Sequence, residues 1–300
     1  MSIADFGWVV QPPVFAWLAL GLGLCVGSFL NVVIHRLPKM MERAWRADCA
    51  ELLGAQSPIL PGQPAPPEEG RYNLFVPRST CPGCGSAIKA WQNVPLLSWI
   101  LLKGKCAYCK SPISVRYPLV ELLAGLGAAG AAAHFGVGLA AAGAMLFVWG
   151  AIALAFIDQA TGYLPDDLTI PLVWAGLLLN LAGTFVPLRE AVIGAAAGYL
   201  SLWSVYWLFK LVTGKEGMGY GDFKMNAAVG AFLGWKILPL VILVSAVLGL
   251  ASGLVQMLAT RGGWVSNFSF RFGPYIALAG IVTLFWGQAI FRLVPVIRPF

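Results

Sequence analysis

The amino-acid sequence predicts an all-α polytopic integral membrane protein with about eight transmembrane helices. Hydrophobic side chains make up 59% of the 300 residues and charged ones only 11%, whereas about a quarter of the residues in a soluble domain are charged. Apolar runs of membrane-spanning length recur along the chain, and one long hydrophilic stretch follows the first of them. These observations favour a helical bundle in the membrane with one sizeable loop domain.

The apolar runs define the expected helices in order. The first would be about 33 Å long at 1.5 Å per residue, enough to cross the hydrocarbon core. It lacks a basic segment before it and a small-residue cleavage site after it, so we expect no cleavable signal peptide. The sixth run is too short to cross the bilayer upright. The eight expected spans are 13–34, 117–134, 137–158, 167–186, 190–212, 223–234, 236–259 and 273–294.

The hydrophilic stretch at 35–116 determines the expected orientation. It holds 11 of the 20 Lys and Arg residues, and such an excess marks cytoplasmic loops. The net charge of +7 is therefore interpreted as a topology signal, and we expect no nucleic-acid partner. The loops at 159–166, 213–222 and 260–272 then share the cytoplasmic side. The predicted divisions are a first helix at 1–34, a cytoplasmic loop domain at 35–116 and a membrane bundle at 117–300.

Four cysteines in this loop have a metal-binding spacing. Two Cys-x-x-Cys pairs, "CPGC" and "CAYC", are separated by 21 residues and comprise Cys81, Cys84, Cys106 and Cys109. Two such turns can bring four thiolates around one Zn²⁺ in a closed structural site. Disulfides are the alternative, which a reducing cytosol disfavours. Because a segment of about 40 residues has too small a core to fold well alone, we predict a small cytoplasmic zinc-binding loop domain.

Several carboxylates lie at the predicted cytoplasmic boundary of the bundle. Asp166 and Asp167 follow a proline and precede an apolar run, so one of them is expected to be a helix N-cap. Asp222 could also cap a short helix and be neutralised by Lys224. Asp158 has no comparable structural explanation, because it ends an apolar helix, where the helix dipole disfavours a negative charge. A functional role therefore explains Asp158 better.

Asp158 and Asp222 are predicted to act as a catalytic pair. Two carboxylates within a few ångströms of each other cannot both ionise cheaply, so one keeps a proton. The pair then offers a base to activate water and an acid to protonate the leaving amine, as in aspartic proteases. Gly217, Gly219 and Gly221 permit a tight turn and the close approach of a substrate backbone.

Together, these motifs resemble the bacterial type IV prepilin peptidases, bifunctional enzymes of the GxGD intramembrane aspartyl protease class. By motif, the resemblance assigns the catalytic aspartates to Asp158 and Asp222. The long insert around 40–72 departs from the family pattern and has no assigned role. The resemblance covers nearly the whole chain and rests on the two cysteine pairs and on "GSFLNVVIHRLP" (27–38), "WQNVPLLSWILLKGKC" (91–106), "RYPLVELLAGL" (116–126), "IDQATGYLPDDLTIP" (157–171), "GKEGMGYGDFKMNAAVGAFLGW" (214–235) and "RFGPYIALAG" (271–280).

The resemblance implies two reactions on one substrate. Members of this family remove the basic leader of prepilins or type II secretion pseudopilins after a glycine. They then transfer a methyl group from S-adenosyl-L-methionine to the new N-terminal residue. The implied location is the bacterial inner membrane, with a multi-pass topology and the active site toward the cytoplasm. The expected partners are prepilins or pseudopilins and the lipid bilayer.

The sequence offers no motif for the methyl-donor site, because no G-x-G-x-x-G follows a predicted strand. In similar proteins the cysteine-bearing loop and its neighbours are associated with methylation, which makes Gly104, Arg116 and Glu121 the candidate cofactor-binding residues. Glu121 is equally well interpreted as a partner of Arg116 or of a helix dipole. Asn31, His35 and Arg36 are expected to mark the cytoplasmic end of the first helix, with Arg36 as a snorkelling anchor.

Two other functions are compatible with parts of the sequence. A peptidase without methyltransferase activity would use the zinc loop to dock the substrate leader. An ion-coupled transporter could place paired carboxylates on an ion path, but it leaves the four cysteines unexplained. Methylation of a cleaved pilin distinguishes the bifunctional enzyme from the first alternative.

Overall fold

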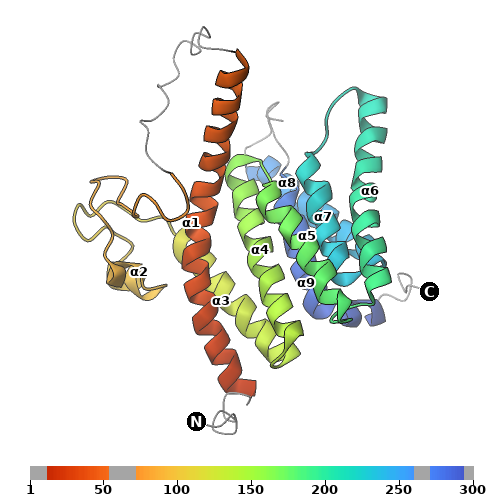
Figure 1. The fold of residues 1–300 in the computed structure, drawn as a ribbon, viewed down its shortest axis with the longest axis horizontal. Coiled ribbons are helices and arrows are strands. Elements are labelled where there is room, and N and C mark those ends of the chain that lie inside the picture. The colour runs from red at the N-terminus through yellow and green to blue at the C-terminus, as the bar shows by residue number, and fades with distance from the viewer. Residues whose placement is uncertain (1–11, 54–71, 260–270, 294–300) are drawn as a thin grey trace.

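The protein is a bundle of helices (Figure 1). The computed structural model describes residues 12–53, 72–259 and 271–293, and the described residues form no strand. Short 3-10 turns occur at Ala90–Asn93 and Trp235–Ile237. The α-helices are α1 Pro12–Leu53, α2 Leu97–Leu101, α3 Arg116–Phe135, α4 Leu139–Thr161, α5 Asp166–Leu181, α6 Leu188–Thr213, α7 Tyr220–Leu233, α8 Leu238–Ala259 and α9 Gly273–Leu293.

α4 lies in the middle of the bundle. α1 and α3 pack on one side of it, and α5 and α9 contact it on the other (Figure 1). The loop that carries α2 lies beyond α1, on the side away from α4 (Figure 1). Phe147, Leu154 and Ile157 of α4 are completely buried. The position of Asp158, the next residue, is therefore set by a well-packed helix.

Glycines allow α1 and α3 to approach closely. A Cβ atom at Gly27 would lie 2.6 Å from the Cα atom of Glu121, and one at Gly23 would lie 2.6 Å from the carbonyl oxygen of Ala124. Small residues at helix interfaces permit this kind of backbone contact in membranes. The packing brings the base of the cysteine-bearing loop, which precedes α3, against the middle of α1.

α7 is short and buried. Its 14 residues give a length of about 21 Å, less than the roughly 30 Å of a bilayer core. Phe223 and Phe232 have no exposed surface. α6 crosses α7 so closely that a Cβ atom at Gly230 would lie 2.1 Å from the carbonyl oxygen of Gly194. The surrounding helices therefore determine where α7 begins.

Asn180 of α5 holds the C-terminal end of α7. Its Nδ2 donates hydrogen bonds of 2.9 and 3.0 Å to the carbonyl oxygens of Ala231 and Phe232. Its Oδ1 accepts the N–H groups of Phe185 and Val186 at 2.9 and 3.1 Å. Buried carbonyls at a helix end need such partners in an apolar interior. Asn180 thereby supports the helix that carries Asp222 at its other end.

The apolar helices identify a membrane protein, as predicted. α5 and α7 are too short to meet a spanning length, and the apolar part of α9 is Gly273–Gly287. Large apolar side chains such as Trp17 and Trp174 are 72% and 59% exposed, which suits a lipid-facing surface. Five described segments are long and apolar enough to cross a membrane: Pro13–Leu52, Arg116–Phe135, Leu139–Thr161, Leu188–Thr213 and Trp235–Val255.

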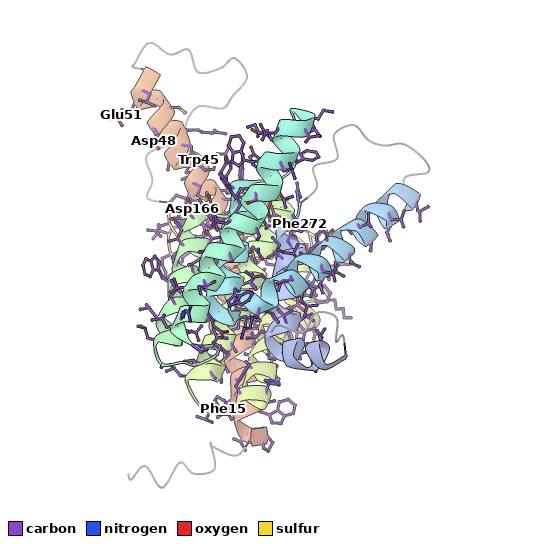
Figure 2. All side chains as sticks on the ribbon, turned by 90° about the vertical axis from the view of Figure 1, so that its right-hand side faces the viewer. Phe15, Trp45, Asp48, Glu51, Asp166 and Phe272 are labelled. Carbon is purple, nitrogen blue, oxygen red and sulfur yellow. The ribbon has the colours of Figure 1, made fainter. Side chains whose placement is uncertain are left out.

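α1 is much longer than the span predicted at 13–34. It continues to Leu53 with Pro38 inside it, because the following segment is rich in good helix formers and carries an i,i+4 ion pair between Glu42 and Arg46. The insert around 40–72 is thus helical as far as Leu53, and its continuation to residue 71 lies outside the described residues. Figure 2 shows Trp45, Asp48 and Glu51 on this extension, toward the end of the bundle that carries Asp166.

Candidate active site and cysteine cluster

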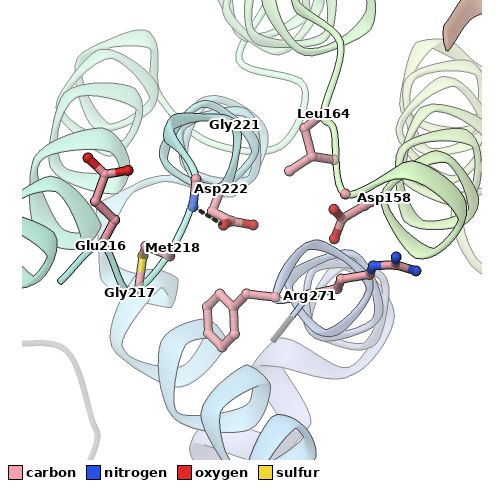
Figure 3. A pocket seen from close by; sticks show the side chains of 11 residues that line it. Asp158, Leu164, Glu216, Gly217, Met218, Gly221, Asp222 and Arg271 are labelled. Atoms are coloured by element: carbon pink, nitrogen blue, oxygen red, sulfur yellow. Dashed lines mark hydrogen bonds between the residues drawn. The ribbon is translucent and has the colours of Figure 1, made fainter. Parts of the chain in front are cut away.

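Asp158 and Asp222 lie at two helix ends that meet at one end of the bundle. Asp158 belongs to the last turn of α4, whose C-cap is Gly162 in the left-handed conformation. Asp222 belongs to the first turn of α7. The two residues are only 5% and 6% exposed, and Figure 3 shows their carboxylates directed into the same space. The structure therefore brings together the two aspartates that the sequence analysis paired.

A cavity of about 310 Å³ lies between these helix ends. Asp158 lies on one wall and Asp222 on the other, with the glycine-rich loop after α6 beside Asp222 (Figure 3). The cavity has an acidic character, because Glu216 adds a third carboxylate to the two aspartates. Arg271 contributes a guanidinium to the same lining. The remaining lining residues are Gly162, Leu164, Gly217, Met218, Gly219, Gly221 and Phe272.

Each of these two carboxylates accepts a backbone hydrogen bond. The N–H of Gly219, the N-cap of α7, donates to Oδ2 of Asp222 over 3.2 Å. The N–H of Gly273, the first residue of α9, donates to Oδ2 of Asp158 over 3.1 Å. The aspartates are thus oriented by two different helix starts.

The glycine-rich loop packs against the segment that follows α4. A Cβ atom at Gly221 would lie 2.6 Å from Cβ of Leu164, and one at Gly217 would lie 3.0 Å from Cδ1 of Phe209. Glycine is needed at Gly221 because a side chain would push Leu164 out of contact. Gly217, Gly219 and Gly221 all line the cavity, so its wall carries no side chain at these three positions.

The capping roles expected for the other aspartates are wrong. Pro165, not Asp166 or Asp167, is the N-cap of α5, and both aspartates lie in the first turn of that helix. Lys224 does not neutralise Asp222; its Nζ lies 2.6 and 2.7 Å from the two carboxylate oxygens of Asp166. A carboxylate in the first helical turn is favourable without capping because it faces the positive end of the helix dipole.

This arrangement suits hydrolysis by an aspartate pair. Two carboxylates that face one cavity can share a proton, since ionising both would place like charges close together. One can then accept a proton from water and the other can donate a proton to a leaving group.

The four predicted cysteines form one cluster. Their Sγ atoms all lie within 4.8 Å of one another, and none of the four is in a disulfide. Each pair sits in a tight turn, with Gly85 N–H donating to the Cys81 carbonyl over 2.8 Å and Lys110 N–H to the Cys106 carbonyl over 3.2 Å. The two turns face each other, so the spacing argument placed these side chains correctly.

The cluster fits a tetrahedral metal ion. Sulfur ligands at about 2.3 Å from zinc would be separated by roughly 3.8 Å in a tetrahedral site, and the Sγ atoms of Cys81 and Cys109 are 3.7 Å apart. The Ser111 hydroxyl, helped by backbone N–H groups of Gly83 and Cys84, lowers the pKa of the Cys81 thiol to about 6. A thiol that is readily deprotonated favours metal binding, because the thiolate is the ligand. This cluster could bind a metal.

The candidate methyl-donor residues lie around the junction of the loop and α3. Gly104 has a positive φ of 66° and packs on Trp99, where a Cβ atom would lie 2.9 Å from Cζ2. Arg116 begins α3, and its Cζ lies 5.7 Å from the ring centroid of Tyr117. Glu121 is 9% exposed, and its Oε2 accepts the N–H of Leu96 over 2.8 Å. Glu121 therefore has a docking contact in addition to any ligand role.

Arg36 is not the snorkelling anchor that the sequence suggested. It is 7% exposed, and its Nη1 and Nη2 donate to the carbonyl oxygens of Asn73 and Pro77 over 2.9 and 2.6 Å. Asn31 similarly donates from Nδ2 to the carbonyl of Tyr117 over 3.0 Å. Both side chains tie the cysteine-bearing loop and α3 to α1, so they do more than mark a helix end.

Several cavity residues were missed by the sequence analysis. Arg271 and Phe272 lie in "RFGP", which served only as a marker of resemblance, and Glu216 belongs to the glycine-rich segment without an assigned role. Gly273 of the same motif, which contacts Asp158, was missed as well. Arg271 Nη1 donates to the carbonyl of Gln159. A Gly-Pro at a helix start was the available sign of a turn there, but nothing in it indicated contact with Asp158.

Comparison with known proteins gives a consistent result. The family described as Bacterial Peptidase A24 N-terminal domain matches residues 22–135, and the Type IV leader peptidase family matches residues 145–254. A protein of Stutzerimonas stutzeri named "Prepilin leader peptidase/N-methyltransferase" is 51% identical over 93% of both chains. Proteins of the same name from Burkholderia pseudomallei (strain K96243) and Pseudomonas aeruginosa are 54% and 50% identical, covering 92% and 94% of this chain and 86% and 94% of theirs. No solved structure matches.

Proposed function

The chain belongs to the type IV leader peptidase family, and from this premise we propose how its residues perform the family's two reactions. The protein is a prepilin leader peptidase and N-methyltransferase. It removes the leader of a prepilin and methylates the N-terminus that cleavage exposes. The proposals below concern the residues, the metal and the orientation in the membrane.

Asp158 and Asp222 carry out the cleavage. The observation that supports this most directly is that both buried carboxylates face one cavity, from the last turn of α4 and the first turn of α7. The ionised carboxylate takes a proton from water as the water oxygen bonds to the peptide carbonyl carbon. The protonated carboxyl gives its proton to the amide nitrogen as the C–N bond breaks, which leaves a carboxylic acid and an amine.

The substrate would bind as an extended backbone along the loop that contains Gly217, Gly219 and Gly221. A pilin's apolar helix would remain in the membrane, so that its scissile bond reaches the end of the bundle where the two aspartates lie. The excess of Lys and Arg in 35–116 supports placing this end at the cytoplasmic face of the inner membrane. Eight spans, with α5, α7 and α9 included, are part of the same proposal. Type II secretion pseudopilins are further candidate substrates.

The cysteine cluster would hold a structural Zn²⁺. Cys81, Cys84, Cys106 and Cys109 would supply four sulfur ligands and leave no open position for a reacting group. The ion would join two turns of a loop that has little core of its own. It has no step in the reaction.

The methyl-donor site is proposed near Gly104, Arg116 and Glu121. S-Adenosyl-L-methionine, the donor implied by the methyltransferase names of the relatives, supplies an electrophilic methyl group when bound. The carboxylate of Glu121 suits its positive groups, the guanidinium of Arg116 suits its carboxylate, and the positive φ of Gly104 keeps a tight turn beside them. A peptidase-only enzyme and a transporter are not favoured, because the relatives' names carry both activities.

The test uses purified protein in lipid, a prepilin peptide with its leader, and S-adenosyl-L-methionine, with products read by mass spectrometry. Wild type should yield a leaderless, methylated product. Asp158→Asn and Asp222→Asn should each lower the cleavage rate by at least about a hundredfold and leave methylation of a leaderless peptide intact. The matched control is Asp167→Asn, an exposed aspartate in the same region, which should cleave normally. Cleavage by both dyad variants would exclude the proposed pair.

A further inference from the structure

The tripeptide Arg271–Gly273 reaches the active site from a distant part of the sequence. Gly273 follows Asp158 by 115 residues, yet its N–H donates to Oδ2 of Asp158 over 3.1 Å. Gly273 is buried and begins α9. The positive N-terminal end of α9 therefore lies directly against a carboxylate at the negative C-terminal end of α4. This contact offsets the unfavourable position of Asp158 on its own helix.

Gly273 leaves no room for a side chain beside this carboxylate. A Cβ atom there would lie 2.7 Å from Oδ2 and 3.1 Å from Cγ of Asp158. At Gly219, which donates to Asp222 in the equivalent way, a Cβ atom would lie 4.0 Å from Oδ2. A side chain therefore has space at position 219 but not at position 273. Only the hydrogen bond to Asp158 requires a glycine as its donor residue.

Arg271 holds the backbone of the same helix end. Its Nη1 donates to the carbonyl oxygen of Gln159, the residue after Asp158. The last carbonyls of an α-helix lack partners within the helix, so this contact satisfies and fixes one of them. The other charged groups around this cavity are Asp222 on α7 and Glu216 on the preceding loop.

We propose that Arg271 and Gly273 are positioning residues for Asp158: Arg271 fixes the end of α4, and Gly273 fixes the side chain. The start of α9 then orients the carboxylate of Asp158, and the start of α7 orients that of Asp222. This inference rests on the proposed role of the two aspartates. It assigns no contact with substrate to Arg271 or Gly273, although Arg271 lines the cavity together with Phe272.

The test compares Gly273→Ala, Arg271→Lys and Arg271→Met with wild type in lipid. Gly273→Ala should lower kcat for prepilin cleavage by about a hundredfold, the effect of a misplacement of about 1 Å, and leave KM within about threefold. Arg271→Met should lower kcat by about tenfold, and Arg271→Lys should restore most of it because a donor and a charge remain. Methylation of a leaderless peptide should be unchanged. Gly253→Ala, which meets no atom within 4 Å, and Lys215→Met on the loop before Asp222 are the matched controls.

Carbodiimide labelling of the same samples gives a readout that does not require activity. Gly273→Ala should increase labelling of Asp158 several-fold over wild type and leave that of Asp222 unchanged. Wild-type kcat and unchanged labelling in Gly273→Ala would overturn the inference, as would equal activity of Arg271→Met and wild type. A loss of methylation together with cleavage would indicate general damage and also overturn it. If wild type fails to cleave, the proposed function fails, and the labelling still decides whether Gly273 positions Asp158.

Discussion

Lys224 of α7 forms an ion pair with both carboxylate oxygens of Asp166 of α5, which lie 2.6 and 2.7 Å from its Nζ. The pair joins the first turn of α5 to the second turn of α7, beside the aspartate cavity. The side chains are 29% and 54% exposed, so solvent screens the attraction, which should contribute no more than about 1 kcal/mol to stability. Its main effect is to hold the start of α7 next to the segment that follows Asp158.

We therefore expect Lys224→Met to lower the rate of prepilin cleavage by about threefold to tenfold, with a change in unfolding free energy of less than about 1 kcal/mol. The exchange of both residues, Asp166→Lys with Lys224→Asp, should recover part of the activity, because the attraction is restored with opposite sense. Steady-state cleavage rates and thermal unfolding in detergent measure the two effects. No recovery in the double variant would show that Lys224 acts through something other than Asp166.

The crossing of α6 and α7 should tolerate a larger side chain poorly, because the two backbones are in contact there. Gly230→Ala would put a Cβ atom 2.1 Å from the carbonyl oxygen of Gly194, so the two backbones must separate. We expect destabilisation by about 1–3 kcal/mol, as for other overpacked interiors, and a lower yield of folded protein. Gly21→Ala, on an exposed face of α1 with no atom within 4 Å, is the control, and equal melting temperatures for both variants would contradict the expectation.

Metal content tests the cysteine cluster. Purified wild type should contain stoichiometric zinc, and Cys81→Ser should lose it and make residues 77–116 more sensitive to protease, because the ion joins the two turns. Cys49→Ser removes an exposed thiol of α1 and should retain zinc. Wild-type protein without bound zinc in metal analysis would refute the assignment.

Glu121→Gln separates two roles of one side chain. The amide oxygen of glutamine can still accept the N–H of Leu96, so the loop should stay docked on α3. If the charge of Glu121 helps to bind the methyl donor, methylation should fall by about tenfold, the usual value of a lost charged hydrogen bond. Cleavage should change by less than about twofold. Unchanged methylation in this variant would leave Glu121 with the docking role alone.

The sequence predicted the helices well where hydropathy defines them. The span expected at 117–134 is α3, Arg116–Phe135, and that expected at 190–212 is α6, Leu188–Thr213. The extension of α1 to Leu53 was missed because hydropathy detects apolar segments, and this one is polar. The helix there depends on local propensity and on the Glu42–Arg46 pair, which a search for membrane spans does not weigh.

The residues of the candidate site could be predicted from the sequence where their side chains have a distinctive chemistry. Asp158 and Asp222 were paired because each is a carboxylate in an apolar setting, and the cysteines because thiolates at this spacing suit a metal. Gly273 could not be found in this way, since its contribution is a backbone N–H and an absence of volume. Arg36 was misinterpreted because a basic residue at a helix end suggests lipid headgroups, whereas the structure uses it to bind two loop carbonyls.

The length of α1 has a consequence for the membrane around the enzyme. Its 42 residues extend about 63 Å, roughly twice the thickness of a hydrocarbon core. Its far part touches the segment next to Asp158 through an edge-to-face contact of Trp45 with Tyr163, whose ring centroids are 5.4 Å apart. Bilayer thickness influences the tilt of a spanning helix, and a tilt of α1 moves Trp45 more than the part inside the lipid. The acyl-chain length of the surrounding lipid thus becomes a variable that acts on the segment that follows Asp158.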